Sequence, residues 1–265
     1  MSNRAAEVAG AEDRNSGHQS VGYCNDVPTL TGKVAVVTGG SRGIGFATAE
    51  ALLTEGASVV ISGSSGNHLD AAVKRLASHA GRVTAVQADV RSYEDVKTLM
   101  ATAVKEFGGL DILINNAGVG VFKPVAETTV EEWHRVLDTN LSGVFYCCHA
   151  ALPYMKQRGG GWIINISSLA SKNAFVNGGV YCASKSALNA FSETLMQEVR
   201  YDGIRVAYVL PGSVNTGFGG LSNTKSEWAL MPEDVALAVV DLVVFPARSL
   251  PSRVEIRPAQ PPRKS

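Results

Sequence analysis

The chain has 265 residues, with 24 Lys and Arg against 24 Asp and Glu, so its formal net charge is zero. With 45% apolar and 18% charged residues it can bury a sizeable core, which excludes an intrinsically disordered chain. The charge balance argues against nucleic acid or an anionic membrane as a main partner, because both require a surplus of Lys and Arg. The length allows one large domain or two small ones.

Cysteine and histidine spacing predicts no metal site. None of the four cysteines forms a C-x-x-C pair, and none of the five histidines forms an H-x-x-x-H pair. No stretch approaches the roughly 20 apolar residues that span a bilayer. The acidic residues Glu7, Glu12 and Asp13 are untypical of a secretory or mitochondrial leader. We therefore expect a soluble cytoplasmic protein.

The first residues, 1–29, lack helical or strand periodicity and are expected to form a flexible extension. Apolar β-branched runs then alternate with longer helical patterns, up to a surface tail at 258–265. Strands are predicted at 33–38, 58–62, 82–88, 111–115, 162–167, 204–210 and 254–256. Helices are predicted at 43–55, 67–79, 92–107, 129–158, 179–202 and 232–245. This alternation predicts an α/β fold, a single-domain Rossmann-like doubly wound parallel sheet with helices on both faces.

A glycine-rich turn, T-G-G-S-R-G-I-G over 38–45, joins the first predicted strand to the first predicted helix. Such a turn lets the backbone approach a pyrophosphate, while the helix N-terminus supplies N–H donors. Glycines needed only for a tight turn and close packing are the alternative interpretation. The position at the first strand–helix turn favours dinucleotide binding. The expected contacts in this turn are Gly39, Ser41, Arg42, Gly43, Ile44 and Gly45.

Tyr181 and Lys185 lie four residues apart and therefore on one face of a predicted helix. Ser168 lies thirteen residues before the tyrosine, and Asn140 lies in the long preceding helix. A free phenol titrates near pH 10, so Tyr181 requires a neighbouring cation such as Lys185 to act as a base near neutrality. An exposed lysine and a half-buried tyrosine on an amphipathic helix are the alternative.

Together with N-N-A-G at 115–118 and P-G-S-V-N-T at 211–216, these motifs resemble the short-chain dehydrogenase/reductase family over about 29–256. The resemblance implies a catalytic tetrad of Asn140, Ser168, Tyr181 and Lys185. In it the serine holds the substrate oxygen, the lysine also binds the nicotinamide ribose, and the asparagine, at a helix distortion, holds a relay water. The further cofactor contacts implied are Asp89, Val90, Asn116, Ala117, Gly118, Pro211, Gly212, Val214 and Thr216, together with Tyr181 and Lys185.

The alternative interpretation is structural. Ordinary turns would favour the residues at 115–118 and 211–216, and a helix cap would favour an aspartate at Asp89. Two positions depart from the family pattern. Ser171 replaces the glycine that usually lies three residues after the catalytic serine, and Asn177 replaces a proline often found four residues before the tyrosine. Both are expected to alter the wall of the substrate pocket.

The segment after the second predicted strand bears on which dinucleotide binds. An acid there would hydrogen-bond the ribose 2′-hydroxyl of NAD and repel a 2′-phosphate, and 62–67 contains none. Arg42 is a basic residue inside the glycine turn, and Ser64 and Ser65 can donate to phosphate. The basic residue that many NADP-using members carry just after this strand is missing. We expect NADP(H) to be preferred, with NAD(H) possible.

The resemblance implies an NADP(H)-dependent oxidoreductase whose domain spans 30–257, acting on a carbonyl or secondary alcohol. The short segment 217–231 predicts an open pocket for a small ketone or a 3-oxoacyl thioester. Its expected lining is Phe122, Phe175, Val176, Phe218, Leu221 and Trp228. A dinucleotide sensor or scaffold without turnover and an epimerase or lyase are the alternatives. Assembly as a homotetramer or homodimer through the two long helices is expected.

Overall fold

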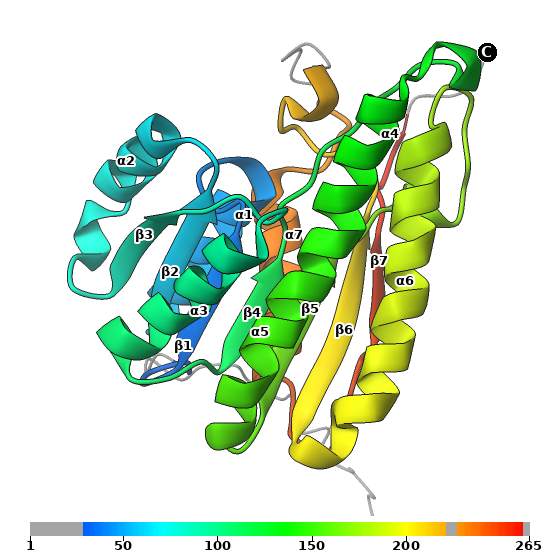
Figure 1. The fold of residues 1–265 in the computed structure, drawn as a ribbon. Coiled ribbons are helices and arrows are strands. Elements are labelled where there is room, and N and C mark those ends of the chain that lie inside the picture. The colour runs from blue at the N-terminus through cyan, green and yellow to red at the C-terminus, as the bar shows by residue number, and fades with distance from the viewer. Residues whose placement is uncertain (1–28, 221–226, 262–265) are drawn as a thin grey trace, which may run out of the picture.

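Seven parallel strands run through the centre of the protein, with helices on both faces (Figure 1). This computed structural model describes residues 29–220 and 227–261. The predicted N-terminal extension therefore lies outside the described residues except for Thr29, and so do residues 262–265 of the predicted tail. Because all strands are parallel, their carboxyl ends meet along one edge of the sheet.

The strand order is β3-β2-β1-β4-β5-β6-β7, which confirms the predicted doubly wound sheet. The chain reverses its direction of travel between β1 and β4, and crevices for ligands open at such a switch point. The strands are β1 Val34–Thr38, β2 Ser58–Gly63, β3 Val83–Gln87, β4 Ile112–Asn115, β5 Gly161–Ile166, β6 Ile204–Pro211 and β7 Arg253–Ile256. The helices are α1 Gly43–Thr54, α2 Gly66–Arg75, α3 Tyr93–Phe107, α4 Val130–Leu137, α5 Gly143–Gln157, α6 Gly179–Val199 and α7 Pro232–Val244.

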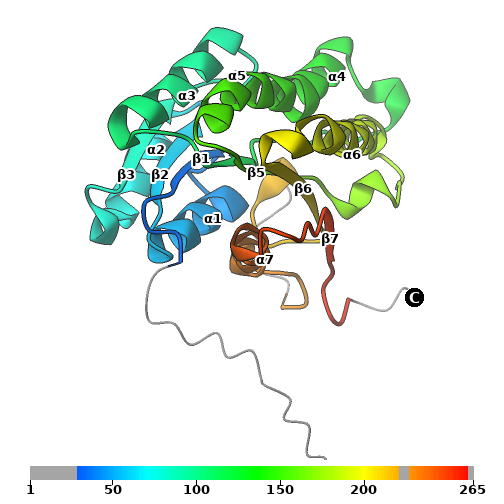
Figure 2. The same ribbon diagram turned by 90° about the horizontal axis from the view of Figure 1, so that it is seen from below.

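Helices cover both faces of the sheet (Figure 2), and the core accordingly has two layers, one on each side. Apolar residues of α1, α2 and α7 pack on one face, and those of α3, α5 and α6 pack on the other. The central strand β1 is buried along its whole length, as expected for an apolar strand covered on both faces. Burial on both faces holds the strands in register, and this register places the loops that follow each strand.

The predicted helix over 129–158 is interrupted by one π-helical turn, Asp138–Ser142, between α4 and α5. Asn140 lies in this turn, which confirms the expected helix distortion. Single π turns are rare and occur frequently at functional sites. Two other predicted helices, 67–79 and 179–202, end in short 3-10 turns at Ala77–His79 and Arg200–Asp202.

No helix in the described part of the chain is long and apolar enough to cross a membrane. Across 29–220 and 227–261, no group of three or more His, Cys, Asp or Glu side chains is placed to hold a metal ion.

Candidate active site

A cleft of about 1080 Å³ runs along the carboxyl edge of the sheet. Its walls come from the segments that follow β1 through β6, where ligands bind in open α/β sheets. Most of the expected site residues line it: Gly39, Ser41, Arg42, Gly43, Ile44, Ser64, Asp89, Val90, Asn116, Ala117, Gly118, Ser168, Tyr181, Lys185, Pro211, Gly212, Val214 and Thr216.

Two expected site residues, Gly45 and Asn140, are buried behind the cleft wall and do not line it. A Cβ at Gly45 would overlap the side chain of Asn116 and the carbonyl of Gly39. This glycine therefore allows the loop after β1 to lie directly against the loop after β4. Its contribution to binding is indirect, through the shape of the turn.

The loop after β1 is locked to the loop after β4 by four hydrogen bonds. The Asn116 side chain donates to the carbonyls of Thr38 and Gly39 at 2.9 and 3.1 Å. In return, the Thr38 hydroxyl accepts the backbone N–H groups of Asn116 and Ala117 at 3.0 and 3.1 Å. A rigid glycine turn with a helix N-terminus behind it fits a pyrophosphate, so these residues fit a dinucleotide.

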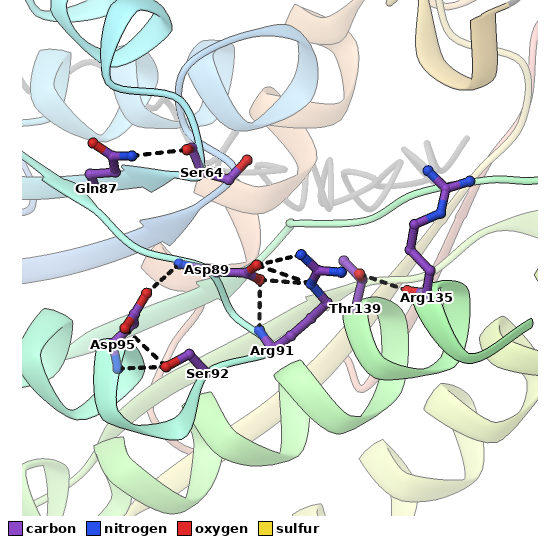
Figure 3. A network of polar contacts seen from close by, with 8 residues as sticks. All are labelled: Ser64, Gln87, Asp89, Arg91, Ser92, Asp95, Arg135 and Thr139. Carbon is purple, nitrogen blue, oxygen red and sulfur yellow. Dashed lines mark hydrogen bonds and ion pairs between the residues drawn. The ribbon is translucent and has the colours of Figure 1, made fainter. Parts of the chain in front are cut away.

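At the end of the cleft formed by β2 and β3, Figure 3 shows a network of polar side chains. Arg91 donates to the Asp89 carboxylate at 2.6 Å and lowers the pKa of that carboxyl. The cap of α3 is Ser92, whose hydroxyl accepts the N–H of Asp95 at 3.3 Å, so Asp89 is not the helix cap. Its carboxylate remains at the cleft surface. The Gln87 amide donates to the Ser64 carbonyl at 3.1 Å and fixes the turn after β2.

Tyr181 and Lys185 face the cleft from the start of α6, and Ser168 faces it from the end of β5. The Nζ of Lys185 donates to the carbonyl of Ile166 at 2.8 Å. Burial lowers the pKa of this lysine to about 8. Burial raises the pKa of Tyr181, and a hydrogen bond with the Ser168 side chain opposes that shift. The three side chains therefore meet at one point of the cleft.

Asn140 is fully buried and bonded to its neighbours through its side chain. Its Oδ1 accepts the N–H of Val119 at 2.8 Å, and its Nδ2 donates to the Val119 carbonyl at 2.9 Å and to Ser184 Oγ at 3.1 Å. These bonds tie the π turn to the segment after β4 and to α6. The side chain of Asn140 thus positions the helix that carries Tyr181 and Lys185.

The two departures from the family pattern have different outcomes. Ser171 does not line the cleft. Instead its hydroxyl donates to the Ser168 carbonyl at 2.6 Å and accepts from the Asn189 amide at 2.8 Å. The Asn189 side chain also accepts from Ser167 at 2.6 Å. Asn177 does not line the cleft either, so neither residue forms part of its wall as expected. The φ of Asn177 is 69°, a value that a proline ring forbids.

The apolar side chains expected at the substrate end mostly line the cleft: Phe122, Phe175, Phe218 and Trp228. Val176 is an exception, because it is 87% exposed and lies outside the lining. Leu221 lies outside the described residues.

Sequence reasoning missed several side chains that line the cleft: His68, Arg91, Arg135, Arg257, Pro258 and Pro261. His68 lies in the first turn of α2, three residues after Ser65, so helical spacing from the serines could have located it. The last three follow β7, and Pro258 and Pro261 belong to the segment 258–265 that the sequence predicted as a surface tail. This segment also borders the cleft, since the Pro258 ring lies close to Gly212 in the cleft wall.

Comparison with known proteins agrees with this geometry. The family model described as short chain dehydrogenase matches residues 33–227. The chain belongs to the short-chain dehydrogenase/reductase family. As a short-chain dehydrogenase/reductase it is an oxidoreductase acting on CH–OH or C=O groups.

Relatives of similar length support the assignment. An uncharacterized oxidoreductase of Staphylococcus aureus (strain N315) is 35% identical over 229 residues, covering 86% of this chain and 98% of that protein. One from Methylorubrum extorquens is 40% identical over 233 residues, covering 83% and 93%.

Solved structures of other short-chain dehydrogenase/reductases superpose closely. An alcohol dehydrogenase from the archaeon Thermococcus sibiricus, complexed with 5-hydroxy-NADP, is 33% identical with a TM-score of 0.81, over 88% of this chain and 99% of that one. A metagenomic short-chain oxidoreductase in complex with NADP is 34% identical with a TM-score of 0.77, over 88% and 100%.

Proposed function

We propose that this protein is an NADP(H)-dependent oxidoreductase that interconverts a ketone and a secondary alcohol. The observation that carries the proposal is the convergence of Ser168, Tyr181 and Lys185 at one end of a cleft whose other end begins at the glycine turn. Side chains for proton transfer and a cradle for a dinucleotide are thereby combined in one continuous space.

In the proposed reaction, the Ser168 hydroxyl donates a hydrogen bond to the substrate oxygen and holds it beside Tyr181. A reduced dinucleotide held at the glycine turn and by Lys185 would supply the hydride that reduces the carbonyl carbon. Tyr181 donates its phenolic proton to the substrate oxygen, which completes the alcohol. Lys185, cationic below its pKa of about 8, lowers the cost of the phenolate that remains. In the oxidation direction the same phenolate accepts the alcohol proton.

The cofactor preference rests on Arg42 and on the absence of an acid after β2. Arg42 lines the cleft with an exposed side chain, and its guanidinium makes no hydrogen bond or ion pair within the described residues. A free guanidinium is suited to bidentate binding of a phosphate. Two of the similar structures are complexes with NADP or 5-hydroxy-NADP, which supports the same preference.

The first experiment compares kcat/KM with NADPH and NADH, and then repeats the comparison in Arg42→Ala. Because Arg42→Ala removes a charge-assisted hydrogen bond to the 2′-phosphate, we expect NADPH affinity to fall about tenfold or more and NADH affinity to stay the same. Lys105→Ala removes the same charge from an exposed side chain on α3 and is the matched control. A wild-type enzyme that prefers NADH would contradict the proposed cofactor.

The same assay tests the alternatives. A sensor or scaffold would bind NADPH without oxidising it on any carbonyl compound, and an epimerase or lyase would convert substrate without net cofactor turnover. Against the sensor, all four tetrad positions carry the residue types that the chemistry requires. Assembly through the long helices α5 and α6 is part of the proposal, and sedimentation would test it. A cytoplasmic location stays a prediction from the sequence.

A further inference from the structure

Two phenylalanines pack against the catalytic tyrosine at the substrate end of the cleft, and a third packs against one of them. We call Phe122, Phe175 and Phe218 the aromatic wall; all three line the cleft. They come from the segment after β4, the loop between β5 and α6, and the segment after β6. An inference about this wall rests on the proposed function, because it concerns what reacts at Tyr181.

Phe122 is the centre of the wall. Its ring centroid lies 5.4 Å from that of Tyr181, 6.0 Å from that of Phe175 and 6.4 Å from that of Phe218. The Tyr181 ring is also 5.7 Å from Phe218. The contacts of Phe122 with Tyr181 and Phe218 are edge-to-face, the arrangement that aromatic rings favour. Phe122 and Phe218 flank the Tyr181 ring, so we expect a substrate bonded to the Tyr181 hydroxyl to lie beside them.

The backbone is shaped to admit the wall. A Cβ at Gly120 would lie 2.7 Å from the Phe122 ring and 2.9 Å from the Phe218 ring, so a larger residue there would displace both. The ring packing is therefore built into the segment after β4 and is not an accidental meeting of surface side chains.

Among residues 29–220 and 227–261, part of the wall is left as uncovered apolar surface. Phe175 is 48% exposed, and Trp228, which lines the same cleft, is 37% exposed. Phe122 and Phe218 are half-buried and complete the inner part. Exposed aromatic faces grouped at a cleft mark a surface that an apolar ligand covers.

We propose that the substrate is an uncharged ketone, or the corresponding secondary alcohol, with an aromatic ring next to the reacting carbon. A ring in that position has three rings to pack against, in the edge-to-face and tilted geometries that the wall already uses. A straight acyl chain lacks a ring face or edge for these contacts, and a carboxylate would lose hydration against them.

The experiment compares two methyl ketones of equal carbon number, one aryl and one straight-chain, with a 2-oxo acid and a 3-oxoacyl thioester, all with NADPH. We expect the highest kcat/KM for the aryl ketone. Phe175→Ala is expected to raise its KM about fivefold or more and to leave the KM for NADPH unchanged. The matched control is Val176→Ala, since Val176 is the next residue along the chain and points away from the cleft into solvent; it should leave both values unchanged.

A second readout is independent of turnover. In the inactive variant Tyr181→Phe with NADPH bound, saturation-transfer NMR should show contact between protein and the ring protons of the aryl ketone, weakened by Phe175→Ala. A higher kcat/KM for the straight-chain ketone, the oxo acid or the thioester would overturn the inference and leave the proposed function standing. Absence of turnover with every carbonyl compound, despite NADPH binding, would instead overturn the proposed function.

Discussion

The ammonium nitrogen of Lys185 lies 5.9 Å from the centre of the Tyr181 ring and is buried beside it. The helical spacing of four residues sets this relationship, and the carbonyl of Ile166 at the end of β5 holds the lysine in place. Burial disfavours the charged form of both groups, so it lowers the pKa of the lysine and raises that of the tyrosine. The site therefore carries an electrostatic cost until ligands enter.

The burial of the Lys185 ammonium predicts that the free energy of unfolding rises with pH above neutrality. In the cofactor-free protein the pKa of Lys185 is about 8, against 10.5 for an ordinary lysine. The unfolded chain therefore binds more protons between these values, and stability rises with pH across that window. Between about pH 7 and pH 10, wild type should gain about 2 to 3 kcal/mol of unfolding free energy relative to Lys185→Met. Urea unfolding of both proteins measures this; a constant difference would show that the lysine is not desolvated.

The Tyr181 pKa predicts opposite pH profiles for the two reaction directions. Because burial raises this pKa, the phenol stays protonated at neutral pH and is ready to act as an acid. Reduction should therefore be nearly independent of pH around neutrality, whereas oxidation should rise with pH as the phenolate forms. Steady-state rates in both directions test this, with Tyr181→Phe as the inactive control. Reduction that falls as pH drops through neutrality would contradict the assigned acid.

Gly45 is predicted to be essential for the shape of the glycine turn although it does not line the cleft. In Gly45→Ala the added methyl overlaps Asn116 and the Gly39 carbonyl, so the loops after β1 and β4 must separate. We expect a loss of about 1–3 kcal/mol in unfolding free energy together with weaker NADPH binding.

Gly66→Ala is the control for that variant. Its Cβ would lie 3.1 Å from the Gln87 side chain, the end of an exposed group that can move aside. Thermal unfolding and NADPH titration of both variants are the measurements. If the two variants had the same stability and the same NADPH affinity, the close approach of Gly45 to Asn116 would not be what requires a glycine at this position.

Ser171 is predicted to position the catalytic serine. Ser171→Ala removes the hydroxyl that bonds the Ser168 carbonyl and the Asn189 amide, which frees the segment after β5. Since misplacement of a reacting group lowers the chemical step, kcat should fall about fivefold to tenfold while NADPH affinity stays the same. Ser171→Thr retains the hydroxyl and should restore most of the rate. If NADPH affinity fell by as much as kcat, the substitution would have disrupted the whole site instead of displacing Ser168 alone.

Much of the fold could be predicted because its signals are local or periodic. Apolar runs of strand length, helical spacing and the glycine turn identified the seven strands, the helices and the class of sheet that they form. The order of the strands within the sheet came from the structure. The pair Tyr181 and Lys185 was predictable for the same reason, since one helix turn brings them onto one face. Reading the interval 129–158 as a single helix was less accurate, because the bonds of Asn140 to Val119 depend on a partner 21 residues away.

The sequence by itself determined the family, the alternation of strands and helices along the chain and the residue types available for proton transfer, since each of these follows from short, contiguous patterns. Only the tertiary structure decided which distant groups meet. It placed Arg257, Pro258 and Pro261 in the cleft wall and bonded Ser171 to Ser168 and Asn189. It also brought Phe122 and Phe218 from separate segments against Tyr181, and Phe175 against Phe122. Such contacts depend on how helices pack on the sheet. Packing between segments that are far apart in the chain produces no periodic pattern in the sequence.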